Sequence, residues 1–301
     1  MTLSFQDRWD ASRREVDAWL DRLLPPAGQP PAVIHEAMRY SVFAGGKRLR
    51  AVLVAATAEA LGCRHPEQHV PGCAVELIHT YSLIHDDLPA MDDDDFRRGK
   101  PTSHKVYGEA LAILAGDALL THAFALLARY PQGPEYAALR TRLAEETALA
   151  AGTPHGMVAG QVLDVASSAG APDAERLREI HRLKTGAMIR GAVRCGALLG
   201  EAAGDILDGL TEYGEALGLA FQITDDLLDV TATREELGKT PGKDAAQSKL
   251  TFPAVHGLER SRAMARETVD RALAVLAGIG TGLADASFLR DLAVFVLERK
   301  H

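Results

Sequence analysis

Long helical periodicity with few interruptions is the feature that most constrains the fold of this chain. Pro25-Pro26 and Gly45-Gly46 are among the few breaks, and the segments between such breaks keep an apolar face for several helical turns. Ala (50) and Leu (39) are abundant among the 301 residues, whereas aromatic residues make up only 5%. Because Ala and Leu favour helices, and strands favour β-branched and aromatic residues, the sequence predicts an all-α fold.

The periodic segments predict a single domain of roughly ten or more helices, with no alternating strand run, sequence repeat or low-complexity linker. We expect helices at 5–24, 32–43, 49–61, 67–88, 107–130, 134–151, 156–168, 174–200, 204–230, 251–258, 262–278 and 285–299. The run of small residues within 174–200 predicts close helix packing, and the wall of a central cavity is the alternative.

Composition excludes several classes of protein. The formal net charge of −8 and the absence of a basic stripe argue against a nucleic-acid partner. Cys63, Cys73 and Cys195 form no CxxC pair, which is typical of a reducing compartment. Charged residues occur within the first ten positions with no apolar signal region, and no stretch approaches eighteen uncharged apolar residues. We therefore expect a cytoplasmic protein without an integral membrane segment.

Two aspartate clusters stand far apart in the sequence, each at the end of a long apolar segment. The second, Gln222-Ile-Thr-Asp-Asp-Leu-Leu-Asp229, places Asp225 and Asp229 one helical turn apart, with Gln222 on the same face. Neighbouring carboxylates repel each other, so an apolar helix with several of them indicates a neutralising cation. Oxygen ligands select hard ions, and Mg²⁺ typically binds one or two carboxylates together with substrate phosphates.

The first cluster has a different geometry. Asp86 and Asp92 are six residues apart and would lie on different faces of a straight helix. Pro89 disfavours helical structure at Leu88 and breaks the hydrogen-bond ladder, so we expect a bulge that returns Asp92 to the side of Asp86. Asp92–Asp95 alone resembles a solvated acidic patch, and an EF-hand calcium loop is excluded by the spacing.

Basic residues accompany both clusters, as a polyphosphate ligand requires. Lys47 and Arg50 follow a glycine turn, and Arg97 and Arg98 follow the acidic run of the first cluster. His79 lies seven residues before Asp86, on the same helix face. Lys184-Thr185 interrupts a helix, and lysines follow the second cluster. The candidates for anion binding are Lys47, Arg50, His79, Arg97, Arg98, Lys184, Lys239, Lys243 and Lys249.

These motifs resemble, in order and spacing, those of the trans-isoprenyl diphosphate synthases. The matching segments run from Gly-Gly-Lys-Arg-Leu-Arg through Leu-Ile-His-Asp-Asp-Leu-Pro-Ala-Met-Asp and Lys-Thr-Gly to Gln-Ile-Thr-Asp-Asp-Leu-Leu-Asp and Gly-Lys-Thr-Pro-Gly-Lys-Asp. The four-residue gap before Asp92 is similar to that of bacterial farnesyl and plant-type geranylgeranyl diphosphate synthases. The resemblance implies the isoprenoid synthase fold, a helical bundle around a central cavity, as one polyprenyl synthase domain over 1–301 and usually a homodimer.

The resemblance also implies a role for each matching residue. Three Mg²⁺ ions would bind Asp86 and Asp92 on one wall and Asp225 on the other, with Asp229 supporting. The allylic diphosphate would bind Arg97, Lys184, Thr185, Gln222, Lys239 and Lys249, with Thr185 and Gln222 near the reacting carbon. Isopentenyl diphosphate would bind Lys47, Arg50, His79 and Arg98. Gln161 and Asp164 match an element that orients neighbouring site residues.

The implied reaction is head-to-tail condensation of isopentenyl diphosphate with dimethylallyl or geranyl diphosphate, by ionisation, attack and deprotonation. A class I terpene cyclase would bind one diphosphate and lack the set formed by Lys47, Arg50 and His79. A non-catalytic prenyltransferase subunit would have eroded aspartate motifs, and an unrelated Mg²⁺-dependent hydrolase is a further alternative.

The resemblance implies that product length depends on the residues that precede the first cluster. Tyr81 lies five residues before Asp86, about 7.5 Å along a helix. By resemblance, Tyr81 and Ser82 are candidates for limiting chain length, and an aromatic residue here favours the fifteen-carbon product, farnesyl diphosphate. Geranylgeranyl diphosphate is the alternative, as is a Tyr81 that packs away from the cavity. The C-terminal residues 298–301 are expected to fray, and closure over the site is the alternative.

Overall fold

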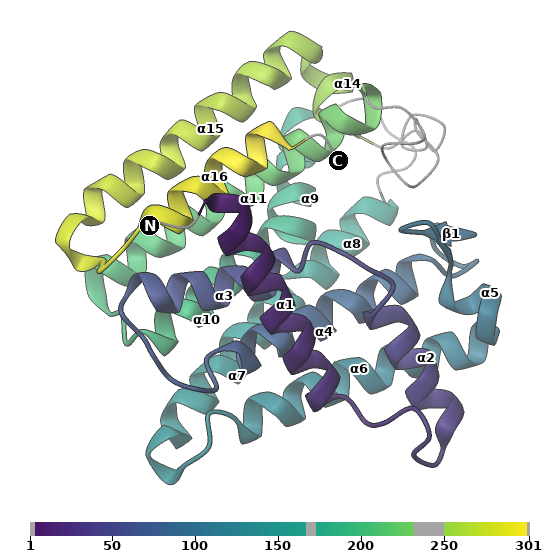
Figure 1. Cartoon of the computed structure of the whole chain (residues 1–301). Coiled ribbons are helices and arrows are strands. Elements are labelled where there is room, and N and C mark those ends of the chain that lie inside the picture. Colours follow the sequence, from purple (N-terminus) through teal and green to yellow (C-terminus); the bar gives the residue numbers. More distant parts are fainter. Residues whose placement is uncertain (1–3, 167–172, 232–249, 300–301) are drawn as a thin grey trace. The chain divides into compact units, whose positions relative to one another are not determined.

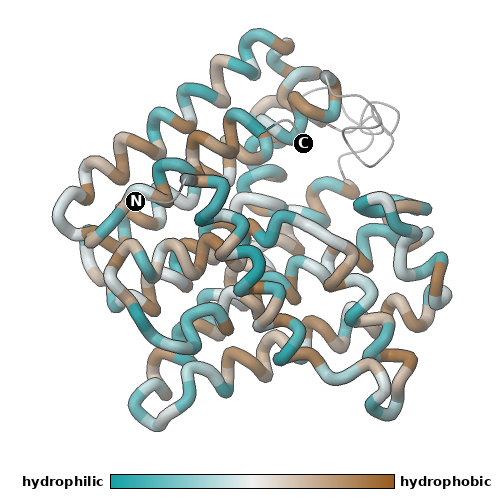
Figure 2. The backbone as a smooth tube through the Cα atoms, viewed as in Figure 1, coloured by the Kyte–Doolittle hydropathy of each residue, from teal (hydrophilic) through white to brown (hydrophobic). Residues whose placement is uncertain are grey.

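Helices dominate the structure of this chain. The computed structural model describes residues 4–166, 173–231 and 250–299 (Figure 1). The only strands within these ranges are β1 (Phe96–Arg97) and β2 (Lys100–Pro101), a hairpin that pairs Phe96 with Pro101. The predicted all-α fold is thereby confirmed. Hydrophilic and apolar residues alternate along the helices, which is the pattern expected of helices with one buried face (Figure 2).

The chain divides into two compact parts. The first part comprises residues 1–55 and 65–144, and the second comprises 56–64 and 145–301. The divisions fall within or beside α3 (Leu49–Ala60) and α7 (Ala137–Ala151). A single domain over 1–301 stays a prediction.

The first part is built around α4 (His69–Asp86), which is buried along most of its length. It packs against α6 (Glu109–Arg129), and α1 (Phe5–Leu23) packs against it as well. Ser4 caps α1 by accepting a hydrogen bond from the Asp7 amide, and Pro25-Pro26 follow the end of this helix. The remaining helices of this part are α2 (Ala32–Val42) and α5 (Ser103–Tyr107).

Helix α6 was not anticipated as a candidate membrane span. By length and composition alone it is apolar enough to cross a membrane, the one such helix among the described residues. Asp117 interrupts its apolar residues, so the sequence shows no run of eighteen uncharged residues here. Its face toward α4 is buried, for example at Leu119 and Leu126, whereas Ile113 and Leu114 are exposed.

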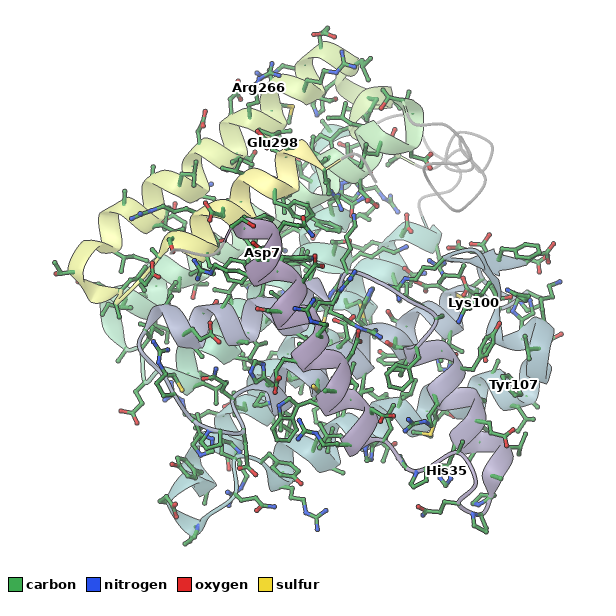
Figure 3. The ribbon with its side chains drawn as sticks, viewed as in Figure 1. Asp7, His35, Lys100, Tyr107, Arg266 and Glu298 are labelled. Atoms are coloured by element: carbon green, nitrogen blue, oxygen red, sulfur yellow. The ribbon has the colours of Figure 1, made fainter. Side chains whose placement is uncertain are left out.

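The second part is built around α11 (Gly204–Thr231), which packs against α10 (Ala187–Leu199) and α15 (Leu258–Ile279). The other helices of this part are α8 (Met157–Ala166), α9 (Ala174–His181), α14 (Phe252–His256) and α16 (Ser287–Glu298). Exposed charged side chains such as Arg266 project from α15 (Figure 3).

The predicted helix at 174–200 is divided by a π-helical turn, Arg182–Gly186, between α9 and α10. This turn is packed through glycines. A side chain at Gly160 of α8 would collide with the backbone of Lys184, and one at Gly218 of α11 would meet the Cα of Gly186. The small residues therefore serve close packing, as predicted, and the packing fixes the turn that carries Lys184 and Thr185.

We predict that Gly160→Ala destabilises the protein by about 1–3 kcal/mol, because the added methyl group must displace the Lys184 backbone. Gly278→Ala, in the last turn of α15 with open space around it, is the matched control and should stabilise by up to about 0.5–1 kcal/mol. Urea unfolding measures both changes. Equal stability of the two variants would contradict the packing described for the turn.

Candidate active site

The first aspartate cluster begins where α4 ends. The backbone N–H of Asp92 donates to the carbonyl oxygen of Asp86 at 2.8 Å, and that of Asp94 donates to Asp87 at 3.1 Å. The chain thus folds back on the end of α4 after Pro89. The expected return of Asp92 to Asp86 is confirmed for the backbone, although the ligand role of both carboxylates stays a prediction.

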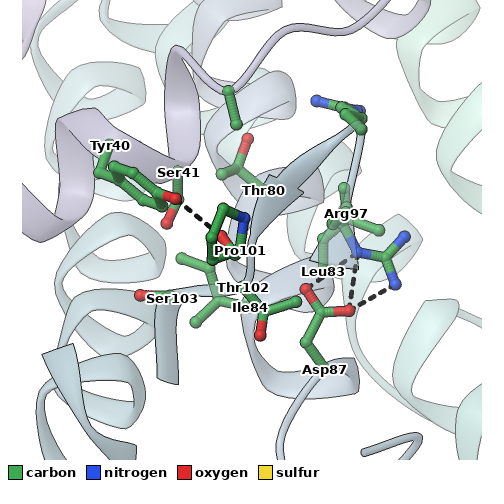
Figure 4. A pocket seen from close by; sticks show the side chains of 12 residues that line it. Tyr40, Ser41, Thr80, Leu83, Ile84, Asp87, Arg97, Pro101, Thr102 and Ser103 are labelled. Atoms are coloured by element: carbon green, nitrogen blue, oxygen red, sulfur yellow. Dashed lines mark hydrogen bonds and ion pairs between the residues drawn. The ribbon is translucent and has the colours of Figure 1, made fainter. Parts of the chain in front are cut away.

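Asp87 and Arg97 form the ion pair at the centre of this cluster. The Nε of Arg97 donates to both carboxylate oxygens of Asp87, at 2.7 and 2.9 Å, and its Nη2 lies 2.6 Å from Oδ1 (Figure 4). Burial raises the pKa of the Asp87 carboxyl, and the hydrogen bonds from Arg97 oppose that rise. The sequence predicts that Arg97 binds an anionic ligand, but it does not predict the ion pair with Asp87 that holds the guanidinium in place.

A small cavity of about 30 Å³ adjoins this ion pair (Figure 4). Its lining includes Thr80 of α4 and Thr102, which follows the hairpin. Tyr40 of α2 donates its hydroxyl hydrogen to the carbonyl oxygen of Pro101 at 2.8 Å and so ties the hairpin to α2. The hairpin is therefore attached to α2 through Tyr40 and to the end of α4 through the ion pair of Arg97 with Asp87.

Three of the predicted isopentenyl diphosphate residues, Arg50, His79 and Arg98, lie near one another in the first part. Arg98 donates a hydrogen bond to the carbonyl oxygen of Gly45, and its guanidinium lies so close to Gly46 that a side chain there would collide with it. Gly46 has a φ of +128°, which a glycine adopts readily. Burial, and then the charges of Arg50 and Arg98, hold the pKa of His79 well below its ordinary range. The imidazole is therefore neutral at physiological pH.

Arg48 anchors the loop that carries these residues. Its side chain is 2% exposed, donates to Asp17 at 2.7 Å and to the Val42 carbonyl oxygen at 2.6 Å, and lies 3.7 Å from buried Glu76. Its φ of +54° lets the chain turn directly after Lys47. The motif alone gives no role for Arg48, because its acidic partners, Asp17 and Glu76, come from distant segments.

Lys184 lies on the π-helical turn of the second part. Its Nζ is 2.6 Å from the Oδ2 of Asp164 on α8. This ion pair agrees with the expectation that Asp164 orients a site residue. A π-helical turn within a helix is frequent at functional sites, because it redirects side chains that a regular helix would place elsewhere.

Thr185 and Gln222 are in direct contact. The Thr185 hydroxyl donates to the Oε1 of Gln222 at 2.8 Å, and the Nε2 of Gln222 donates to Asp226 at 2.8 Å. The structure thus brings together the two residues expected near the reacting carbon, and adds Asp226, which the sequence analysis left without a role.

Asp225 is paired with the C-terminal segment. Arg299 donates to the Phe221 carbonyl oxygen at 2.8 Å and to the Oδ1 of Asp225 at 3.2 Å, and it lies over the Phe221 ring. Its side chain is 2% exposed. The expectation that the C-terminal residues fray is therefore wrong for Arg299, since two hydrogen bonds and an aromatic face hold it. Residues 300 and 301 lie outside the described residues.

The aspartates of each part offer the oxygen donors that hard divalent cations prefer. Asp225 is half-exposed and already faces a cation, the Arg299 guanidinium, while Asp229 lies buried one turn further along α11. Within the described residues, no group of three or more His, Cys, Asp or Glu side chains forms a metal site. Oxygen donors in ones and twos suit Mg²⁺ that also binds substrate phosphates.

The sequence model of the polyprenyl synthetase family matches residues 31–277. The chain belongs to this family. It is 43% identical over 298 residues to a farnesyl diphosphate synthase of Escherichia coli (strain K12), with 99% of each chain covered. It is 47% identical over 256 residues to the heterodimeric geranylgeranyl pyrophosphate synthase large subunit 1 of Arabidopsis thaliana, covering 84% of this chain and 68% of the relative. A solved FPP/GFPP synthase structure from Zymomonas mobilis has a TM-score of 0.84 at 37% identity, covering 97% and 98%.

The expected chain-length residues of this polyprenyl synthetase lie on α4. Tyr81 is 8% exposed, and its ring packs edge-on against His85 with a centroid distance of 5.6 Å. Burial, and then the Asp86 charge, raise the pKa of its hydroxyl. Ser82 donates to the carbonyl oxygen of His79 at 2.9 Å. The roles of Tyr81 and Ser82 in chain length stay predictions.

Three expected lysines, Lys239, Lys243 and Lys249, lie outside the described residues. Their roles, and that of Gln161 on α8, stay predictions.

We predict a pH dependence of stability from His181, at the end of α9. Burial lowers its pKa to about 4. Because the unfolded chain binds this proton at a higher pH than the folded chain, the free energy of unfolding falls by about 1.4 kcal/mol per pH unit below about pH 6.5. Urea unfolding of wild type and His181→Gln between about pH 6.5 and 5 measures this loss. Parallel pH profiles of the two proteins would contradict it.

Proposed function

We propose that this polyprenyl synthetase condenses isopentenyl diphosphate with dimethylallyl and then geranyl diphosphate, and that farnesyl diphosphate is its main product. The observation that carries the proposal is the assembly of Arg50, His79 and Arg98 around the Gly45-Gly46 loop, apart in sequence from Lys184 and its partners. A reaction of two diphosphates needs two such groups of cations, whereas a terpene cyclase needs one. The relative of Escherichia coli supports the farnesyl product, and that of Arabidopsis thaliana favours geranylgeranyl diphosphate as the second candidate.

Isopentenyl diphosphate, in this proposal, binds Lys47, Arg50, His79 and Arg98. The lysine and the arginines supply charge-assisted hydrogen bonds to the diphosphate oxygens. His79, kept neutral by its surroundings, contributes an N–H donor. The bound diphosphate is thereby fixed while its double bond remains available to attack the allylic carbon.

The allylic diphosphate, in this proposal, binds Lys184 and Arg97, together with Lys239 and Lys249 from outside the described residues. At about 4 Å and an effective dielectric constant of about 20, each such charge pair is worth about 4 kcal/mol before desolvation. Lys184 and Arg97 are held by ion pairs with Asp164 and Asp87, so their positions are fixed before the substrate binds. They stabilise the charge that develops on the departing diphosphate, and that diphosphate accepts the proton in the last step.

Mg²⁺ is the proposed metal, three ions in each active site, with Asp86, Asp92, Asp225 and Asp229 as its ligands. When bound, it supplies Lewis-acid stabilisation of the leaving diphosphate. Asp225 would exchange the Arg299 guanidinium for the metal. The proposal rests on the donor chemistry of these carboxylates and on their positions in the family motifs.

A homodimer in the cytoplasm is the proposed state of the enzyme. The exposed residues Ile113 and Leu114 of α6 offer an apolar face that a second copy would cover. All three cysteines are free, as expected in a reducing compartment. Sedimentation of the purified protein over a range of concentrations tests the dimer.

We predict that Asp86→Ala and Asp225→Ala each lower turnover by at least about 100-fold, because each removes a proposed metal ligand. Asp208→Ala, at an exposed position of α11, is the matched control and should retain activity. The assay combines isopentenyl diphosphate, geranyl diphosphate and Mg²⁺, with circular dichroism to verify the fold. If the wild-type enzyme forms no prenyl diphosphate longer than geranyl diphosphate, the proposed function is refuted. An active Asp225→Ala variant at limiting Mg²⁺ would refute the metal assignment.

We predict that Tyr81→Ala shifts the product toward twenty carbons or more, since a methyl group in place of the ring opens space along α4. Tyr136→Ala, which removes a ring packed against His65 in the same part, should leave product length unchanged. Chromatographic sizing of the dephosphorylated products measures both. An unchanged product from Tyr81→Ala, or a twenty-carbon product from the wild type, would count against the role of Tyr81.

A further inference from the structure

A chain of hydrogen bonds in the second part ends at the two residues proposed to face the reacting carbon. The backbone N–H of Phe252 donates to the Oδ2 of Asp226 at 2.8 Å. The Nε2 of Gln222 donates to the Oδ1 of the same carboxylate at 2.8 Å, and Thr185 donates to the Oε1 of Gln222 at 2.8 Å. We call this chain, from Phe252 through Asp226 and Gln222 to Thr185, the Asp226 relay.

The direction of the relay is fixed at its buried end. A backbone N–H can only donate, and a carboxylate that receives it is free to accept a second donor. The group of Gln222 that faces Asp226 must therefore be its NH₂, which turns its carbonyl oxygen toward Thr185. Because that oxygen can only accept, the Thr185 hydroxyl donates its single hydrogen to it. Thr185 is left with oxygen lone pairs and no hydroxyl hydrogen, whereas Gln222 keeps an oxygen lone pair and the second hydrogen of its NH₂ group.

The buried end is held rigidly by packing. Asp226 is 3% exposed, and Phe252 is fully buried in a cluster with Leu177 and Ile223. The centroids of the Phe252 and His181 rings are 5.3 Å apart. Thr251 caps the same helix, α14, by accepting from the Ala254 amide, so the Phe252 N–H is oriented independently of Asp226.

We propose that Asp226 is a positioning residue that acts through Gln222 and Thr185. It turns the negative ends of their dipoles toward the allylic carbon, where positive charge develops on ionisation. This inference rests on the proposed function and adds a role for the buried carboxylate between Asp225 and Asp229. In a dry site, oxygens oriented in advance stabilise a cation without reorganising during the reaction.

An exchange of donor and acceptor tests the relay. In Asp226→Asn, the introduced amide accepts from the Phe252 N–H with its oxygen and presents its NH₂ to Gln222, which must then turn its own amide around. We expect kcat to fall about 100-fold, with the KM for geranyl diphosphate and the half-saturating Mg²⁺ concentration changed less than about threefold. In the double variant Asp226→Asn/Gln222→Glu the introduced carboxylate accepts from both neighbours at unchanged total charge. We expect it to recover at least about tenfold in kcat over Asp226→Asn.

Thr251→Ala is the matched control, because it removes the cap of α14 without changing any donor or acceptor group of the relay. A loss of kcat in Thr251→Ala equal to that in Asp226→Asn would show that Asp226 merely stabilises α14. A large rise in the Mg²⁺ requirement of Asp226→Asn would make Asp226 a metal ligand. Either result, or no rescue in a folded double variant, would overturn the inference while leaving the proposed function standing.

Binding measurements provide a test that does not depend on turnover. Calorimetry compares geranyl S-thiolodiphosphate with an ammonium analogue of geranyl diphosphate that carries positive charge at the reacting carbon. We expect wild type to prefer the ammonium analogue at least about tenfold, Asp226→Asn to lose that preference and the double variant to regain it. Equal affinities in wild type would overturn the inference even if Asp226→Asn does not fold. Binding of neither analogue, together with absent turnover, would instead refute the proposed function.

Discussion

Charge compensation inside an apolar helical framework is the constraint on which this structure depends. Carboxylates and guanidinium groups that are removed from water are costly unless each finds a partner of opposite charge. Asp87 holds Arg97, Asp164 holds Lys184, and Asp225 holds Arg299. Arg48 is buried between Asp17 and Glu76. These pairs fix the groups proposed for catalysis before any substrate is bound.

The backbone departs from regular structure where these charges gather. The chain folds back after α4 so that Asp92 meets Asp86, and the π-helical turn carries Lys184 and Thr185. Arg48 and Arg98 adopt positive φ values, of 54° and 53°. Glycines at positions 46, 160 and 218 permit the close approach that these irregular segments require. Regular helices thus provide the framework, and their interruptions place the polar groups.

Most of the fold was predictable from sequence, because helical periodicity and glycine or proline breaks are local signals. The expected helix at 5–24 is α1, and the return of Asp92 after Pro89 followed from proline geometry alone. Family motifs supplied the candidate site residues. What sequence could not supply were contacts between distant segments, such as Arg299 on Asp225 and the Phe252 N–H on Asp226. The sequence predicts an interruption of the helix at Lys184-Thr185 but not its π-helical form, since that form depends on packing against α8 and α11.

The central claim is that the chain has two diphosphate sites of different composition, and steady-state kinetics of Lys47→Ala and Lys184→Ala tests it most directly. Each variant loses one charge-assisted hydrogen bond, worth about 1.5–3 kcal/mol or a factor of about 10–100. The account predicts that Lys47→Ala raises the KM for isopentenyl diphosphate at least about tenfold and leaves that for geranyl diphosphate within about threefold. It predicts that Lys184→Ala instead lowers kcat and weakens the binding of the allylic substrate. The reverse pattern, or equal effects of both variants on both substrates, would contradict it.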